Sequence, residues 1–427
     1  MDNKDLRGKK LLILGGDNLT KDIVNTAQKM GVYVIVTDWY DVNRSPAKLI
    51  ADEYWTDSIE DYETLSKKIS EQHIDGILTG FTDSYLLPYQ QLCEKTGLPC
   101  YGTKEQFELF ISKDRYKEMC RKYGVPTIKQ YEEDDENMKF PVLVKPVDSS
   151  GSRGIKICNN REELKDAINI SKESSKQGKV IIERYMDCPE ATVFWLFVDG
   201  DYYLTMIGNR HVKHNQDGNV IPLPVGYTFP SYLTPKYKEF VEDNTKKMFK
   251  AAGIRNGMMF MQCKVEDGMC YVYDIGYRLT GSREYNIQEK VCGYNPLIML
   301  IRFALTGRMC KENIAGKINA VNMKPSFNVS CLCAPGTIKD ITGVDEVKNF
   351  PEVIDVAYAH TPGQTITESM KGLLAQITVR VLGAVESKEQ LCPIMQKIGK
   401  TIHFIGDKDE ELMLPGIEEK DIIGKVI

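Results

Sequence analysis

Residues 140–155 read Phe-Pro-Val-Leu-Val-Lys-Pro-Val-Asp-Ser-Ser-Gly-Ser-Arg-Gly-Ile, an apolar strand that ends on Lys145 and continues into a Ser/Gly loop. The lysine provides a fixed positive charge, and the glycines let backbone N–H groups approach anionic oxygens closely. The segment therefore suits phosphate, although an ordinary hairpin between strands at 142–145 and 154–158 fits it as well. It is not a Walker loop, because no Gly-Lys-Ser/Thr follows a four-residue spacer. The loop residues expected at the phosphates are Ser149, Ser150, Gly151, Ser152 and Gly154, with Arg153 as a second cation.

A second segment, residues 179–197, places two acids on either side of a turn. An apolar strand ends at Glu183, a turn contains Pro189, and another strand begins near Glu190. A nucleoside needs main-chain donors and acceptors at its base and a carboxylate for its ribose hydroxyls. Glu183, the backbone of Tyr185 and Met186, and Glu190 meet those needs.

A third segment, residues 257–282, is typical of a hairpin, because two strand patterns flank the turn Glu-Asp-Gly at 266–268. Gln262 and Asp274 lie on its two arms, and they share one face if the register allows. Arg278 follows just beyond. That face could hold a metal ion and the phosphates that the ion bridges.

A lysine, a Ser/Gly loop, two hinge glutamates and a paired-strand metal site with a trailing arginine, in this order, resemble the ATP-grasp superfamily. The resemblance covers roughly residues 9–427. It implies an α/β and α+β fold in which two subdomains clamp ATP, with Mg²⁺, or Mn²⁺ in its place, bridging the phosphates. It also implies that a carboxylate is phosphorylated to an acyl phosphate, which an amine then displaces.

The resemblance assigns roles residue by residue. Lys113 and Lys145 correspond to the two nucleotide lysines, and residues 149–154 to the lid over the phosphates. Glu183, Tyr185 and Met186 correspond to the adenine hinge, and Glu190 to the ribose ligand. The expected catalytic residues are Arg278, which would stabilise charge on the transferred phosphoryl group, and a basic cluster of Arg210, His211 and Lys213. A histidine beside an arginine is, however, more often a surface group whose hydrogen bonds are already made.

The metal motif departs from the family pattern. Gln262 replaces the usual first acid, Asp274 replaces a glutamate, and Gly276 replaces an asparagine. Mg²⁺ is often held by one or two carboxylates together with substrate phosphates, so Asp274 and the Gln262 carbonyl remain the expected metal ligands. Thr280, Gly281 and Ser282 do match.

Three domains are expected. Residues 1–102 alternate strand and helix patterns as a Rossmann-like, parallel βαβ unit. Residues 103–310 form the ATP-grasp domain, with a lid subdomain at about 125–190, and residues 311–427 form a C-terminal α+β domain that closes the substrate pocket. Gly15, Gly16 and Asp38 hint at a dinucleotide site, but the third glycine of that motif is missing.

Composition narrows the function classes. The chain has 427 residues, a net charge of −5 and scattered cations, which argues against a nucleic-acid surface. No signal peptide is evident and no apolar run reaches about 18 residues, so neither export nor a membrane span is expected. Twelve dispersed cysteines are expected to be reduced thiols in a cytoplasmic protein.

The sequence thus predicts an ADP-forming carbon–nitrogen ligase with small carboxylate and amine substrates, without nucleic-acid or membrane partners. The resemblance also allows a homodimer. Three alternatives stay open: a carboxylase-like member, a nucleotide-binding protein with little catalysis because its metal motif is depleted, and a dehydrogenase that uses the first domain.

Overall fold

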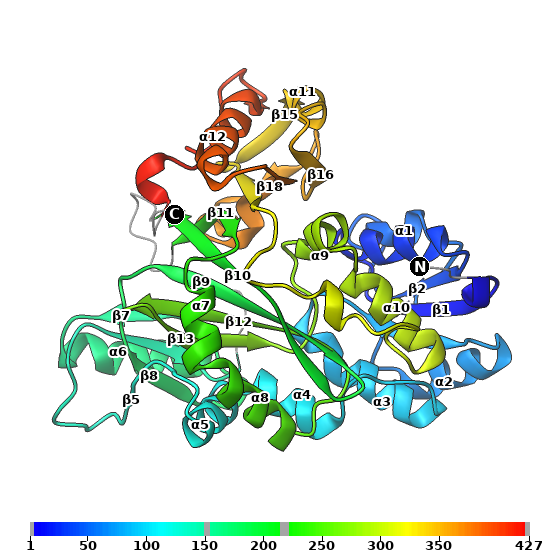
Figure 1. Cartoon of the computed structure of the whole chain (residues 1–427), viewed down its shortest axis with the longest axis horizontal. Helices are drawn as coiled ribbons and strands as arrows, with labels where there is room; N and C mark the ends of the chain where they lie inside the picture. Colours follow the sequence, from blue (N-terminus) through cyan, green and yellow to red (C-terminus); the bar gives the residue numbers. More distant parts are fainter. Residues whose placement is uncertain (1–3, 149–153, 214–221, 423–427) are drawn as a thin grey trace.

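The computed structural model describes residues 4–148, 154–213 and 222–422. Figure 1 shows an N-terminal α/β unit beside a long central sheet, with a small sheet below that sheet and a C-terminal unit above it. None of the helices in these ranges is long and apolar enough to cross a bilayer. Each of the twelve cysteines is a free thiol, as expected.

The N-terminal unit is a parallel sheet in the order β3-β2-β1-β4. Buried aliphatic residues fill β1 and β2, which pair in parallel from Lys10 opposite Tyr33 to Leu14 opposite Thr37. The predicted βαβ pattern is therefore confirmed. Its elements are β1 (Lys10–Leu14), α1 (Thr20–Lys29), β2 (Tyr33–Thr37), β3 (Glu53–Trp55), α2 (Tyr62–Glu71), β4 (Gly76–Thr79) and α3 (Leu86–Thr96).

Helix α10 (Pro296–Thr306) completes the core of this unit, although it lies about two hundred residues further along the chain. It packs so closely on β4 that a Cβ added at Gly76 would lie 2.3 Å from the carbonyl oxygen of Ala304. Arg302 of α10 also forms an ion pair with Asp5. The expected division at residue 102 therefore does not separate two hydrophobic cores.

A small antiparallel sheet in the order β5-β8-β6-β7 follows, with its own core beneath α6. The hairpin predicted around the Ser/Gly loop is present, because Val142 pairs with Cys158 and Val144 with Lys156. The elements of this region are α4 (Lys104–Ile111), α5 (Lys113–Tyr123), β5 (Gln130–Tyr131), β6 (Val142–Pro146), β7 (Lys156–Cys158), α6 (Arg161–Glu173) and β8 (Val180–Arg184).

The central sheet has eight strands in the order β13-β12-β9-β10-β11-β14-β18-β16. One face is covered by α7 and α8, whose Phe249 meets the Trp195 ring of β9 at 5.2 Å between centroids. The opposite face carries Glu190, the first residue of β9. The elements are β9 (Glu190–Val198), β10 (Asp201–Lys213), β11 (Leu223–Phe229), α7 (Thr234–Phe240), α8 (Glu242–Ala251), β12 (Gly257–Glu266) and β13 (Met269–Gly276).

The C-terminal region extends this sheet with β14, β16 and β18 and adds a three-stranded sheet, β17-β15-β19. A separate hydrophobic core lies between them. Its elements are α9 (Glu284–Ile287), a π-helical turn (Gln288–Cys292), β14 (Ser326–Leu332), β15 (Gly336–Thr342), α11 (Val344–Lys348), β16 (Val353–Tyr358), β17 (Thr365–Ile366), β18 (Ile377–Ala384), α12 (Leu391–Thr401) and β19 (His403–Gly406). Short 3₁₀ turns lie at Lys4–Leu6, Pro46–Leu49, Asp83–Tyr85, Ala315–Lys317, Glu368–Met370, Leu374–Gln376, Lys388–Gln390 and Glu419–Asp421.

Candidate functional site

A buried charge triad joins the small sheet to helix α5. Glu183 of β8 is 2% exposed, and its carboxylate lies 2.8 Å from the Lys145 ammonium while its other oxygen forms an ion pair with Lys117. Two lysine side chains thus share one carboxylate. Burial and the neighbouring Lys145 lower the pKa of Lys117 well below its usual range, because buried charge is costly unless an opposite charge balances it.

Burial and a neighbouring cation perturb the pKa of Lys145. Burial lowers the pKa of Lys145 to about 7, nearby Lys113 lowers it further, and Asp274 opposes the shift. Lys113 begins α5 and lies one helical turn before Lys117, so both lysines share a face of that helix. The Lys145 ammonium also donates to the carbonyl oxygen of Tyr273 at 3.2 Å. The lysines therefore gather at hairpin β12–β13, where bound phosphate would favour their charged forms.

The Ser/Gly loop is described only at its end. Ser149, Ser150, Gly151, Ser152 and Arg153 lie outside the described residues. Gly154 has φ +71°, and a Cβ there would lie 2.6 Å from Cβ of Ser174. Its carbonyl oxygen accepts a hydrogen bond from the Ser171 hydroxyl at 2.6 Å. Gly154 is therefore required for the backbone turn that contacts α6 at this position.

The predicted hinge lies between β8 and β9. The Tyr185 N–H donates to the carbonyl oxygen of Pro141 at 3.2 Å, and Met186 is buried at 5% exposure. Arg184 fastens this hinge to the turn of the β12–β13 hairpin, because its guanidinium contacts both oxygens of Glu266 at 2.6 and 2.8 Å. The hinge is thus fixed next to the hairpin that carries the predicted metal ligands.

Glu190 is held in a network on the free face of the central sheet. It lies opposite Arg210 on one side and Lys264 on the other, and it forms ion pairs with both, at 2.8 Å to Lys264. The Tyr273 hydroxyl donates to it at 3.1 Å. Burial opposes ionisation of Glu190, but Arg210 and Lys264 outweigh it and lower the pKa of the carboxyl. A ribose at Glu190 would have to share a carboxylate that is already fully engaged.

The predicted basic cluster does not converge. Arg210 faces Glu190, whereas His211 points to the other side of β10, where its ring nitrogens lie 2.8 Å from the Thr228 hydroxyl and 3.1 Å from the Asp421 carbonyl oxygen. Burial lowers the pKa of His211 to about 4, so the ring is neutral. Lys213 lies 3.1 Å from the Asp421 carboxylate. His211 and Lys213 thus hold the C-terminal segment. His211 is a histidine whose hydrogen bonds are already made within the protein.

The two residues predicted as metal ligands lie opposite each other in the hairpin. Gln262 lies directly opposite Asp274, and both side chains are partly exposed. Within the described ranges, no three His, Cys, Asp or Glu side chains gather in a way that suits a metal ion. The oxygens of Asp274 and Gln262 fit Mg²⁺ only if phosphates and water complete the shell.

The structure explains why an asparagine is missing at position 276. Gly276 lies opposite Phe260, and a Cβ there would lie 2.3 Å from two atoms of the Phe260 ring. The Arg278 guanidinium stands 5.1 Å from the centre of the same ring. A larger residue at 276 would displace Phe260, which in turn positions Arg278.

Arg278 is tied to the N-terminal unit by Asp83, a residue that sequence reasoning missed. The two side chains make a bidentate contact with distances of 2.6 and 2.7 Å. Asp83 follows β4 at the carboxyl edge of the parallel sheet, where open α/β sheets bind ligands, and that position was its only signal. Lys117 and Lys264 were also missed, although Lys117 follows Lys113 at helical spacing.

Gly16 and Asp38, which resemble part of a dinucleotide site in the sequence, have a structural role. Both oxygens of Asp38 are engaged: one lies 2.9 Å from the Lys48 ammonium, and the other accepts from the Gly16 N–H and the Ser45 hydroxyl, both at 2.7 Å. The carboxylate therefore stabilises the turn after β1 and leaves no free oxygen for a ribose.

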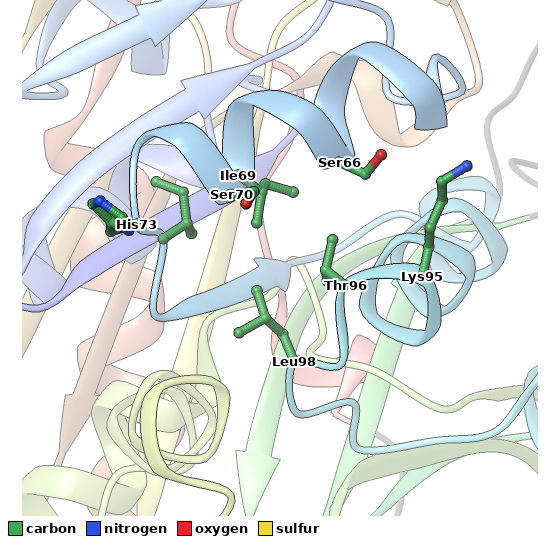
Figure 2. Close-up of a pocket in the computed structure, with 8 residues that line it drawn as sticks. Ser66, Ile69, Ser70, His73, Lys95, Thr96 and Leu98 are labelled. Atoms are coloured by element: carbon green, nitrogen blue, oxygen red, sulfur yellow. The ribbon is translucent and has the colours of Figure 1, made fainter.

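A groove of about 430 Å³ lies elsewhere, between α2 and the end of α3 (Figure 2). Its lining includes Ser66 and Ser70 from α2 and Lys95 from α3, with His73 at one end. None of the residues predicted for nucleotide or metal lines it.

Comparison with known proteins agrees with this geometry. Residues 138–283 match the family model described as the ATP-grasp domain. A formate-dependent phosphoribosylglycinamide formyltransferase from Prochlorococcus marinus is 25% identical over 228 residues, which cover 51% of this chain and 54% of that protein. The chain thus spans about half the length of this relative. The 2-oxoglutarate carboxylase small subunit of Hydrogenobacter thermophilus is 23% identical over 448 aligned residues, which cover 94% of this chain and 90% of that protein.

Among solved structures, the L-amino acid ligase from Bacillus licheniformis superimposes with a TM-score of 0.76. It is 20% identical, and the superposition covers 94% of this chain and 99% of that one. At this identity the likeness shows the shared fold.

Proposed function

We propose that this chain, which contains an ATP-grasp domain at residues 138–283, is an ADP-forming ligase that activates a carboxylate and joins it to an amine. The observation that carries the proposal is the group of Lys117, Glu183 and Lys145, in which two buried lysines with lowered pKa values share one carboxylate next to the predicted metal ligands. The phosphates of ATP would favour the charged forms of these lysines at the hairpin.

Mg²⁺ would be held by Asp274, the Gln262 carbonyl and the phosphates, and it would neutralise charge on the transferred phosphoryl group. The chain's own cations would do the rest: Lys113 and Lys145 bind the phosphates, and Arg278 faces the oxygens where charge develops. Asp83 holds the Arg278 guanidinium in place.

In the first step a carboxylate oxygen attacks the γ-phosphorus and ADP leaves, which forms an acyl phosphate. In the second step an amine attacks the acyl carbon, phosphate leaves with the bonding electrons, and the amine loses a proton. Arg278 lies between the hairpin and the N-terminal unit, so we place the acceptor in that region. Free thiols suit a reducing compartment such as the cytoplasm, and a homodimer stays a prediction.

A carboxylating reaction is the second candidate, because the match to the 2-oxoglutarate carboxylase small subunit extends over 94% of the chain. In that reaction bicarbonate is the carboxylate that is phosphorylated, and the same nucleotide residues serve.

The test is release of ADP and phosphate by the full chain with ATP and Mg²⁺, across a panel of carboxylates with and without amines. The ligase predicts equal amounts of ADP, phosphate and amide product, dependent on both substrates. Stimulation by bicarbonate alone would favour the carboxylase, and absence of nucleotide turnover with every pair would reject both. The test includes Lys145→Met, which removes the buried lysine, and Lys165→Met, a change at an exposed lysine of α6, serves as its matched control.

A further inference from the structure

A second polar region lies on the free face of the central sheet, beyond Glu190 and Arg210. The strand register continues the row from Arg210 to Tyr227 of β11 and then to Asn328 of β14. Next to Asn328, on the same face, Ser330 lies opposite Arg380 of β18. Polar side chains thus cross the sheet from the nucleotide residues to the C-terminal region.

Arg380 forms no ion pair within the described part of the chain, although the charge of Glu284 acts on it from nearby. Its guanidinium donates to the Ser330 hydroxyl at 2.9 Å and makes a longer contact of 3.4 Å with the Asn328 side-chain oxygen. Burial lowers the pKa of Arg380, and Tyr227 and Glu284 oppose that shift. A partly buried guanidinium whose hydrogen-bond partners are neutral, and which makes no ion pair with the nearby carboxylate, is suited to an anion.

Helix α9 and the π turn after it bring further unsatisfied groups to the same region, since α9 packs on β16 and β18. Glu284 and Gln288 lie one turn apart and both are fully buried. One carboxylate oxygen of Glu284 and both amide atoms of Gln288 have no hydrogen-bond partner among the described residues. Buried polar atoms without partners indicate a missing ligand or water.

The region is rigidly built from all three parts of the chain. Arg283, which has φ +68° and directly precedes α9, contacts Asp22 of α1 at 2.7 Å and Asp355 of β16 at 3.3 Å. Asn286 donates to the same Asp355 at 2.9 Å. The unsatisfied groups of α9 are therefore held in fixed positions and do not sit on a loose segment.

We propose that this region is the subsite for an α-amino acid, with Arg380 and Ser330 binding its carboxylate and Glu284 and Gln288 binding its ammonium group. Arg380 and Glu284 act on each other without forming an ion pair, so a zwitterion can place its anionic end at the guanidinium and its cationic end at the carboxylate. Burial raises the pKa of Glu284, and a bound ammonium group would favour its charged form. A simple acid would leave the Glu284 oxygen without a partner. The subsite favours a substrate that carries both charges.

This subsite rests on the proposed function for its reaction, and it adds the chemical class of the acceptor. A short path joins the two regions: Asn328 donates to the Ser282 carbonyl oxygen at 2.8 Å, and Ser282 follows Arg278 by four residues. An amino acid bound at Arg380 would therefore lie beside the segment that carries the predicted catalytic arginine.

The experiment is calorimetric binding of single amino acids to the full chain, with and without Mg²⁺ and a non-hydrolysable ATP analogue. Each amino acid is compared with its α-amide and its 2-hydroxy acid, which lack one of the two charges. We expect at least one amino acid to bind, with each analogue about tenfold or more weaker, the size of one charged hydrogen bond. Absence of binding by every amino acid, or equal binding of the analogues, would overturn the inference.

Variants assign the two ends. Arg380→Met should weaken amino-acid binding about 10- to 100-fold while ATP-analogue affinity stays at the parent value. Arg380→Lys keeps a cation at this position and serves as a second variant in case Arg380→Met does not fold. Glu284→Gln should reduce the preference for the amino acid over its hydroxy acid. Lys400→Met, at an exposed lysine of α12, is the control. Unchanged amino-acid binding in both Arg380 variants would refute the assignment.

The two proposals fail separately. Amino-acid binding that depends on Arg380, without ATP turnover, keeps the subsite and rejects the ligase. ATP turnover with acids that lack an amine, without amino-acid binding, keeps the activating step and rejects the subsite.

Discussion

Raising the pH above about 7 should weaken ATP binding, because Lys145 loses its proton in the free protein near that pH. Bound phosphates favour the charged ammonium, so binding to the deprotonated form must take up a proton. The sign follows from this difference: affinity is full where Lys145 is already protonated and falls as the pH rises.

The magnitude follows from the protonated fraction of Lys145. With a pKa of about 7, roughly half of the free protein carries the charge at pH about 7 and roughly 3% at pH about 8.5. Affinity should therefore fall about 15-fold across that range, or roughly 1.6 kcal/mol, if the bound state stays protonated.

Calorimetry in two buffers with different ionisation enthalpies measures both the affinity and the protons taken up. Lys145→Arg keeps its charge throughout this range, so its affinity should lose the pH dependence, which also removes titration of ATP itself as the cause. Lys165→Met should behave as the parent. A flat affinity in the parent protein, or an equal slope in Lys145→Arg, would refute the reasoning.

Three further predictions concern the C-terminal segment, the metal face and the lid. The pKa of His211 is lowered from 6.5 to about 4, so its contribution to stability is complete above pH 6.5. That contribution is lost as the pH falls toward 4, by up to about 3 kcal/mol. Urea midpoints of the parent should therefore converge with those of His211→Gln across this range, and parallel curves would contradict this. Asp274→Asn should raise the Mg²⁺ concentration needed for half-maximal turnover and Gln262→Glu should lower it, and an unchanged requirement in both would remove the hairpin from metal binding. Gly154→Ala should lower the free energy of unfolding by about 1 kcal/mol or more, because its φ is +71° and the new Cβ meets Ser174, and part of that loss should return in the double variant with Ser174→Gly.

Local patterns predicted the elements of the fold well. Alternating strand and helix patterns predicted the βαβ unit that contains β1, β2 and β4, and the Glu-Asp-Gly turn predicted the hairpin, whose observed register places Gln262 opposite Asp274. Local patterns did not predict that α10 shares one core with the N-terminal unit. Helix periodicity shows that one face of a helix is buried, but it does not show which element covers that face.

The candidate site was predictable only as far as neighbours in sequence decide it. Lys145 and Glu183 were identified, but their contact with Lys117 depends on how α5 packs against the small sheet. Alternation along β10 could have separated Arg210 from His211, because successive strand residues point to opposite faces. Arg380 belongs to no sequence motif, and its proposed role follows from the strand register that places it opposite Ser330.

The central claim is that the chain transfers the γ-phosphoryl group of ATP to a carboxylate. The most direct measurement uses a carboxylate substrate labelled with ¹⁸O on both oxygens and follows the label by mass spectrometry of the released phosphate. An acyl phosphate intermediate predicts one labelled oxygen in each phosphate released with product, and Arg278→Lys should slow that release while ATP affinity stays near the parent value. Phosphate without label, formed at the same rate as product, would contradict carboxylate activation.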